Sequence, residues 1–289
     1  MNLPLPKETR EYFGNDKNRI LKTSNLYLLF NRYVYSWQNN WQMEERDSKE
    51  FRIDISKFSF PNDYISNLFN RQKAILQSLK SSGWHVKPFI ATTDSRLIIG
   101  LGGTSVLETG MTLHPLYGFP YLPGSGLKGL ARAYAKIAED FLDEETKKKL
   151  LHEIFGSEDK DPHNVANNRQ ARVFFMDGLP TTFPKLELDI MNPHYSEYYQ
   201  GNKPPADYLN PVPVTFLTVA AGQKFSFAVY SRDKNLAEKA KAWLIGGLTK
   251  LGAGGKTNVG YGYFKDFSDV IITNLTAVTN QPKINKSSI

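Results

Sequence analysis

The sequence contains no cysteine, which excludes a disulfide framework, a thiolate metal site and a catalytic cysteine. It has no apolar run of the roughly 18–20 residues that a membrane-spanning helix requires, and its N-terminus, MNLPLPKETR, lacks the apolar core of a secretion signal. We therefore expect a cytoplasmic protein. Hydrophobic residues make up 40% and aromatic residues 13% of the chain, which excludes general disorder and allows a sizeable core.

Positive charge exceeds negative charge by seven, and the excess is unevenly distributed. Residues 1–90 carry a net charge of +5, residues 91–199 carry −4, and residues 200–289 carry +6. Two basic ends around an acidic middle favour a polyanionic partner. On charge alone, a basic protein with a solvated surface fits equally well.

The first third of the chain is expected to be mostly helical. The stretch 19–37 is rich in aromatic residues, and 62–82 is a clearer helix because its apolar residues recur at helical spacing before Gly83. We expect residues 1–90 to form an N-terminal region that packs on a main domain at 91–289.

The pattern changes from residue 95 onward to short apolar runs, turns and two helical stretches. The expected elements are a strand at 95–101, a helix after Pro123-Gly124 with Ser125 as N-cap, strands at 171–179 and 185–190, a strand pair at 212–219 and 224–231, a helix at 235–251, and a strand in the YGYF ending at 264. Ala-Ala-Gly between the paired strands suggests a hairpin, and the mixed-charge stretch 144–149 is assigned no element. This order indicates an α+β fold, namely the βαββαβ plan of a ferredoxin-like or RRM-like domain with an extra β-hairpin.

The stretch LTKLGAGGKTNVGYGYF, residues 248–264, contains a Gly-Lys-Thr that resembles the end of a nucleotide-binding P-loop. The first glycine of that motif is missing, because Lys250 occupies its position, and the stretch runs from a helix into a strand rather than the reverse. Its five glycines are instead expected to expose N–H groups that bind an anion such as a phosphodiester. The alternative is a helix-capping Gly252 followed by a flexible turn.

Two motifs together resemble the RAMP superfamily, the RNA-binding subunits of type III CRISPR–Cas effector complexes. They are GFPYLPGSGLKGLARAYA at 118–135, similar to the family's Pro-Gly-Ser helix start, and LGAGGKTNVGYGYF at 251–264, similar to its Gly-rich loop. PVPVTFLTVAAGQKFSFAV at 211–229 is similar to one branch, the sixth Cmr subunit of type III-B complexes. The resemblance covers roughly residues 95–267.

The resemblance implies a non-catalytic scaffold subunit that holds CRISPR guide RNA inside a ribonucleoprotein, at its head near the 3′ part of the guide. Its expected partners are the guide RNA and neighbouring RAMP subunits, with target RNA as a further candidate, and no cofactor or metal is expected. The helix start and the loop supply amides, hydroxyls and positive charge for a phosphate backbone. The candidate RNA-binding residues are Ser125, Gly126, Lys128, Arg132, Gly254, Gly255, Lys256, Thr257 and Asn258. The tyrosines at 261 and 263 are expected on one strand face, either stacking on bases or packing in the core.

Two other functions compete with RNA binding by a scaffold. One is a metal-independent endoribonuclease that processes CRISPR RNA, for which His114 is the strongest candidate. No second acid or base lies beside His114 in the sequence, and the loop where relatives carry a catalytic aspartate has only Glu108. A metal cluster of Asp159, Asp161 and His163 is set aside as a solvated polar loop. The other function is a pure protein-interaction subunit whose basic motifs face acidic neighbours. We expect no catalytic site.

Overall fold

The computed structural model describes residues 6–13, 25–31, 62–103, 109–157, 170–192, 201 and 213–272. Its N-terminal helices are α1 (Lys7–Phe13), α3 (Leu26–Asn31) and α4 (Asn62–Ser81). Helix α4 confirms the helix expected at 62–82, and it ends at Ser81, two residues before Gly83, whose φ is 79°. Of the helix expected at 19–37, the part inside the described ranges is α3 with the residue before it. No helix in these ranges is long and apolar enough to cross a membrane.

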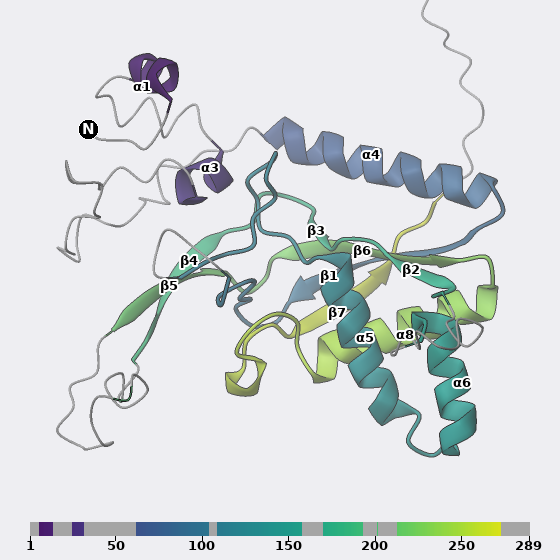
Figure 1. Ribbon diagram of the computed structural model, residues 1–289. Helices are drawn as coiled ribbons and strands as arrows, with labels where there is room; N and C mark the ends of the chain where they lie inside the picture. Colours follow the sequence, from purple (N-terminus) through teal and green to yellow (C-terminus); the bar gives the residue numbers. More distant parts are fainter. Residues whose placement is uncertain are drawn as a thin grey trace, which may run out of the picture.

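The main sheet is antiparallel and has helices on both faces (Figure 1). Its strand order is β2 (Val173–Phe175), β6 (Lys224–Ser231), β1 (His85–Thr93) and β7 (Phe264–Asp269), and β3 (Leu179–Pro180) also pairs with β6. Helices α5 (Gly124–Ala138), α6 (Glu144–Phe155) and α8 (Lys234–Lys250) lie on one side of the sheet, and α4 crosses the other side. The expected α+β fold is therefore confirmed.

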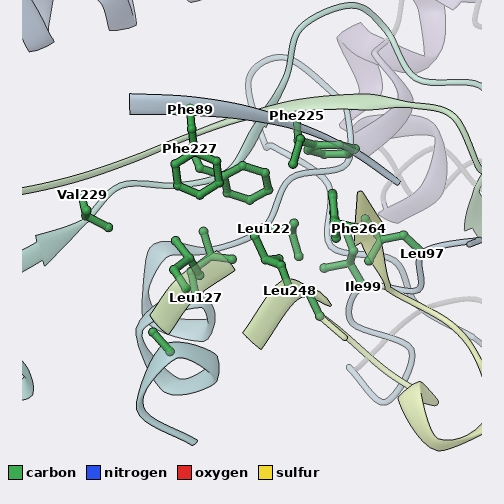
Figure 2. Close-up of a cluster of buried hydrophobic side chains, with 14 of the residues drawn as sticks. Phe89, Leu97, Ile99, Leu122, Leu127, Phe225, Phe227, Val229, Leu248 and Phe264 are labelled. Carbon is green, nitrogen blue, oxygen red and sulfur yellow. The ribbon is translucent and has the colours of Figure 1, made fainter. Parts of the chain in front are cut away.

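The core lies between the sheet and the layer of α5 and α8, and strand β6 shows why. Its alternate residues Phe225, Phe227 and Val229 are fully buried, and they face the helices together with Phe89 of β1 (Figure 2). The rings of Phe89 and Phe227 stack with centroids 5.2 Å apart. Ala228 points to the opposite face, where it packs against α4. Because side chains alternate along a strand, one face of β6 packs on α5 and α8 and the other face packs on α4.

The first strand is β1 at 85–93, so the strand expected at 95–101 is wrong. Sequence reasoning passes over β1 because Pro88 lies inside it, and proline disfavours a central strand. Here the Pro88 carbonyl accepts from Val270, so its ring nitrogen also faces β7, whose ladder with β1 begins only at Phe89. The missing N–H therefore removes only the return bond to Val270 at the end of this ladder, and none to β6, because Ala228 opposite Pro88 accepts from Met176 instead. Leu97 makes only an isolated bridge to Val219. Strand β1 crosses the expected boundary at residue 90, and the division into two regions stays a prediction.

The two strands expected as a hairpin belong to different sheets. Strand β5 (Val214–Val219) pairs with β4 (Leu186–Met191) in a separate two-stranded sheet, whereas β6 joins the main sheet. Buried Thr93, at the end of β1, forms hydrogen bonds with the backbone of the turn between β5 and β6. It exchanges bonds of 2.7 and 2.8 Å with Gly222 and Gln223, and its hydroxyl donates to the Ala220 carbonyl at 3.0 Å. The turn is therefore held by hydrogen bonds to the end of β1, rather than by pairing between β5 and β6. The expected strand at 185–190 is confirmed as β4.

Two helix starts also differ from expectation. The stretch 144–149, assigned no element, forms the first turns of α6, because the Asp143 side chain caps the helix by accepting from the Thr146 amide at 2.9 Å. The N-cap of α5 is Pro123 rather than Ser125, and Ser125 is exposed in the first turn. The expected helix at 235–251 is confirmed as α8.

Glu139 at the end of α5 is a buried carboxylate that joins this helix to α8. It is 7% exposed, and it accepts from Trp243 Nε1 and Lys239 Nζ at 3.1 Å each. We expect Glu139→Ala to lower the free energy of unfolding by about 1–3 kcal/mol, because it leaves the buried indole N–H without its acceptor. Chemical denaturation measures this change. The matched control is Asp140→Ala at the adjacent residue, whose exposed ion pair with Lys147 contributes little.

Candidate functional site

The start of α5 carries the first group of candidate residues. Some amides of its first turn already donate hydrogen bonds to other groups of the protein. The Gly124 amide donates to Asp177 Oδ1 at 2.7 Å, and the Leu127 amide donates to the Pro123 carbonyl at 3.0 Å. A side chain at Gly124 would collide with the Phe175 carbonyl, so this glycine has a packing reason. Ser125 and Gly126 are exposed, and nothing lies within 4 Å of a Cβ added at Gly126. These two residues are the part of the helix start that a ligand can approach.

Lys128 and Arg132 lie one helical turn apart on α5, and both are half-buried. Burial lowers the pKa of Lys128, and the positive charge of Arg132 lowers it further. The Arg132 guanidinium lies over the Phe155 ring, 5.9 Å from its centroid. The two cations disfavour each other at this position, so a phosphate beside them would offset the repulsion. Arg132 also has a packing role that its position in the motif does not reveal.

The Gly-rich loop after α8 is held by hydrogen bonds to the protein. The amides of Gly255 and Gly262 donate to the carbonyls of Ile98 and Arg96, and the Ala253 amide donates to Gly262, each at 2.8 Å. The expectation that glycine amides here are exposed donors is therefore corrected for Gly255 and Gly262. At Gly254, φ is 86° and an added Cβ would lie 2.0 Å from the Ile98 carbonyl oxygen. Close approach within the protein explains this glycine.

The tip of the loop presents polar and charged side chains. Lys256 adopts a left-handed conformation with φ 55°, and both it and Asn258 are exposed. Thr257 is half-buried, and its carbonyl accepts from the Tyr263 hydroxyl at 3.2 Å. Val259 is 70% exposed. The side chains at 256 and 258 are thus exposed polar groups that this loop offers to a ligand.

Helix packing brings the two groups into one layer of the molecule. A Cβ added at Gly246 would lie 2.1 Å from the ring of Tyr134, and one at Gly247 would lie 2.8 Å from Leu130 Cγ. The last turns of α8 therefore lie directly on α5, and the loop leaves α8 at this point (Figure 1).

Tyr261 and Tyr263 precede β7 instead of lying in a strand, and both are half-buried. The Tyr261 hydroxyl donates to Asp189 Oδ2 at 2.7 Å, and this bond raises the pKa of Tyr261. Its ring also meets Phe216 edge-on, with centroids 6.3 Å apart. These contacts agree with packing, the alternative to base stacking.

His114 is fixed by its own turn. Its Nδ1 accepts from the amides of Leu116 and Tyr117 at 3.3 and 3.4 Å, and its ring lies 4.7–5.6 Å from three aromatic rings, those of Tyr117, Phe119 and Tyr121. Burial lowers the pKa of His114, against the opposing charge of Asp177. The contacts explain this histidine as part of the turn.

Four acidic or histidine residues weighed from the sequence lie outside the described residues, namely Glu108, Asp159, Asp161 and His163. Within the described ranges, no group of three or more His, Asp or Glu side chains is arranged to hold a metal ion.

Comparisons with known proteins agree with these motifs. The family model described as the RAMP superfamily matches residues 90–265. The CRISPR system Cmr subunit Cmr6 of Pyrococcus furiosus is 34% identical over 226 residues, which cover 61% of this chain and 66% of that relative. The corresponding Cmr6 of Saccharolobus solfataricus is 28% identical over 266 residues, covering 88% and 84%.

A solved structure extends the likeness to three dimensions. A chain in the cryo-EM structure of the type III-B Cmr-beta complex bound to cognate target RNA matches with a TM-score of 0.56 and 26% identity, covering 78% of this chain and 71% of that one. These relatives confirm the resemblance to the sixth Cmr subunit. Because the family match covers more than half of the sequence and includes both motifs, the protein belongs to the RAMP superfamily.

Proposed function

We propose that this protein is a non-catalytic RNA-binding subunit of a type III-B CRISPR effector complex. The observation that carries the proposal is the placement of both family motifs: α8, which leads into the Gly-rich loop, packs on α5, whose start carries the other motif, and each motif presents exposed residues. The relatives support it, since two are named Cmr6 and a third belongs to a complex bound to target RNA. Guide RNA and neighbouring RAMP subunits are the proposed partners, and target RNA is a further candidate.

The proposed contacts are with the RNA backbone. Lys128 and Arg132 supply charge beside the exposed Ser125 and Gly126, while the loop supplies Lys256, Thr257 and Asn258. Contacts of this kind hold a strand in place without reading its bases, and their affinity falls steeply with salt. This suits a subunit that must hold any guide. We place it at the head of the complex near the 3′ part of the guide, as its branch of the family implies.

The main sheet supports a ferredoxin-like assignment of the domain. Its elements follow the order β1, α5, β2, β6, α8, β7, with α6 inserted between α5 and β2, and β3 and the β4–β5 pair inserted between β2 and β6. The spatial order β2, β6, β1, β7 places the first and third strands of this plan in the centre, with every neighbour antiparallel. We propose that the β4–β5 pair is the extra hairpin of the βαββαβ plan.

Incubation of the full chain with labelled repeat RNA tests both the binding and the absence of catalysis. We expect the RNA to be retained and uncut, with affinity falling at least tenfold between low and physiological salt. His114→Ala should bind equally well, because this histidine serves its own turn. Specific cleavage that disappears in His114→Ala would instead establish the endoribonuclease alternative.

A further inference from the structure

A polar cluster connects the Gly-rich loop to the β4–β5 pair. Asp189 of β4 is its centre: one carboxylate oxygen, Oδ2, accepts from Tyr261 Oη and from Arg96 Nη1, each at 2.7 Å. Arg96 Nε also donates to Glu187 Oε2 at 3.1 Å, and Lys185 pairs with the other oxygen of Glu187 at 2.9 Å. Bonds from Tyr261 and Arg96 lower the pKa of Asp189, which keeps the carboxylate ionised.

The backbone around Arg96 contacts the loop on one side and the strand pair on the other. The Arg96 carbonyl accepts from the Gly262 amide, and the Ile98 carbonyl accepts from the Gly255 amide. Between them, Leu97 exchanges two bonds of 2.9 Å with Val219 of β5. The segment 96–98 therefore fixes the loop and the strand pair to each other through main-chain groups.

The side-chain cluster completes this junction at one particular point of the loop. Tyr261 directly precedes Gly262, which approaches Ala253 so closely that an added Cβ would lie 1.9 Å from its carbonyl oxygen. Asp189 thus anchors the residue at which the loop closes on itself. The Asp189 side chain is 21% exposed and its bond with Tyr261 is partly buried, whereas the Arg96 side chain is 45% exposed, so the Tyr261 bond is the better shielded of the two.

We infer that Asp189 is a positioning residue for RNA binding, which holds the Gly-rich loop against the β4–β5 pair in the conformation that presents Lys256 and Asn258. Arg96 and Tyr261 are the groups through which it acts. This inference rests on the proposed function. Asp189 does not contact RNA itself, because a carboxylate would repel the phosphate backbone. Arg96 has its charge committed to two carboxylates, so it is not a phosphate ligand in this arrangement.

The test compares single and double variants of the full chain, with a labelled single-stranded RNA as the probe. We expect Asp189→Asn and Tyr261→Phe each to weaken RNA binding about fivefold to tenfold, the effect of losing a hydrogen bond to a charged group. Tyr261→Phe removes the bond to residue 189, and Asp189→Asn weakens the same bond by removing the charge of its acceptor, so the loss in the double variant should be smaller than the two single losses combined. Hydrogen exchange of the peptide 251–262 should become faster, while exchange in β1 and β6 should not change.

The control is Asp94→Asn, which makes the same substitution at a carboxylate that pairs with Lys265 at 2.7 Å, away from the strand pair. It should leave RNA binding unchanged. Additive effects of the two single variants, or weaker binding with faster exchange throughout the sheet, would overturn the positioning role. If Lys256→Glu weakens binding but Asp189→Asn and Tyr261→Phe do not, the inference fails and the proposed function stands. If Lys256→Glu has no effect either, the proposed function itself fails.

Discussion

Reversing the charges of Lys128 and Lys256 together is expected to weaken RNA binding by about 100-fold at physiological salt, because two charge-assisted contacts are lost. Each lysine belongs to a different family motif; Lys256 is exposed, and Lys128 is half-buried beside the exposed Ser125 and Gly126. The slope of log affinity against log salt concentration should also become less steep by an amount that corresponds to about two phosphate contacts, since fewer counterions are released. Fluorescence anisotropy of a labelled single-stranded RNA, measured over a series of salt concentrations, gives both quantities.

Lys148→Glu with Lys149→Glu is the matched control, because it changes the net charge of the chain by the same amount on exposed residues of α6. If this control weakens binding as much as the Lys128 and Lys256 variant, the partner responds to overall charge and the proposed surface is wrong. If the test variant instead prevents assembly with neighbouring subunits in the absence of RNA, its lysines face protein. Arg132 is left unchanged in both variants, because its packing on Phe155 would mix binding with stability.

Replacing Gly254 is expected to have the largest effect on stability. Gly254→Ala should lower the free energy of unfolding by about 2–4 kcal/mol, because a Cβ has no room beside the Ile98 carbonyl and the φ of 86° is strained for any other residue. Gly254→Val should cost more. Thermal or chemical denaturation measures the change. A loss of RNA binding in either variant would therefore report a distorted loop rather than a lost contact.

Gly255→Ala is the control for this result, at the next residue and with the same substitution. Its added Cβ would meet only Ile98 Cγ2 at 3.6 Å, an ordinary contact, and its backbone is not in the left-handed region. We expect the stability of Gly255→Ala to stay within about 0.5 kcal/mol of the wild type. Equal losses at the two positions would contradict the contact with Ile98 as the cause.

Local patterns were sufficient for several elements of the fold. Helices α4 and α8 and strand β4 were predicted correctly because each has a regular hydrophobic period over its own length. Helix α6 was missed although its signal was present, since Asp143 followed by two glutamates is typical of a helix start. Strand β1 was missed because it contains Pro88, which is tolerated here since its ring nitrogen faces the end of β7, where only one bond is lost.

The candidate residues were found from the sequence, but the roles of their neighbours were not. Asp177 lies 53 positions from the Gly124 amide that it accepts from, and Asp189 lies 72 positions from Tyr261. No periodicity or motif relates residues so far apart. The contacts of Arg132 with Phe155 and of Gly254 with Ile98 likewise join separate elements.

By itself, the sequence determined the family, the α+β class and the two motifs that carry the basic and glycine residues, because these depend on residues close together in the chain. The tertiary structure alone decided which of those residues remain available to a ligand. Glycines that suggested an open, donor-rich loop give their amides to carbonyls of the segment 96–98 and of the loop itself. A buried N–H must find an acceptor, and which carbonyl lies within reach depends on how distant segments pack.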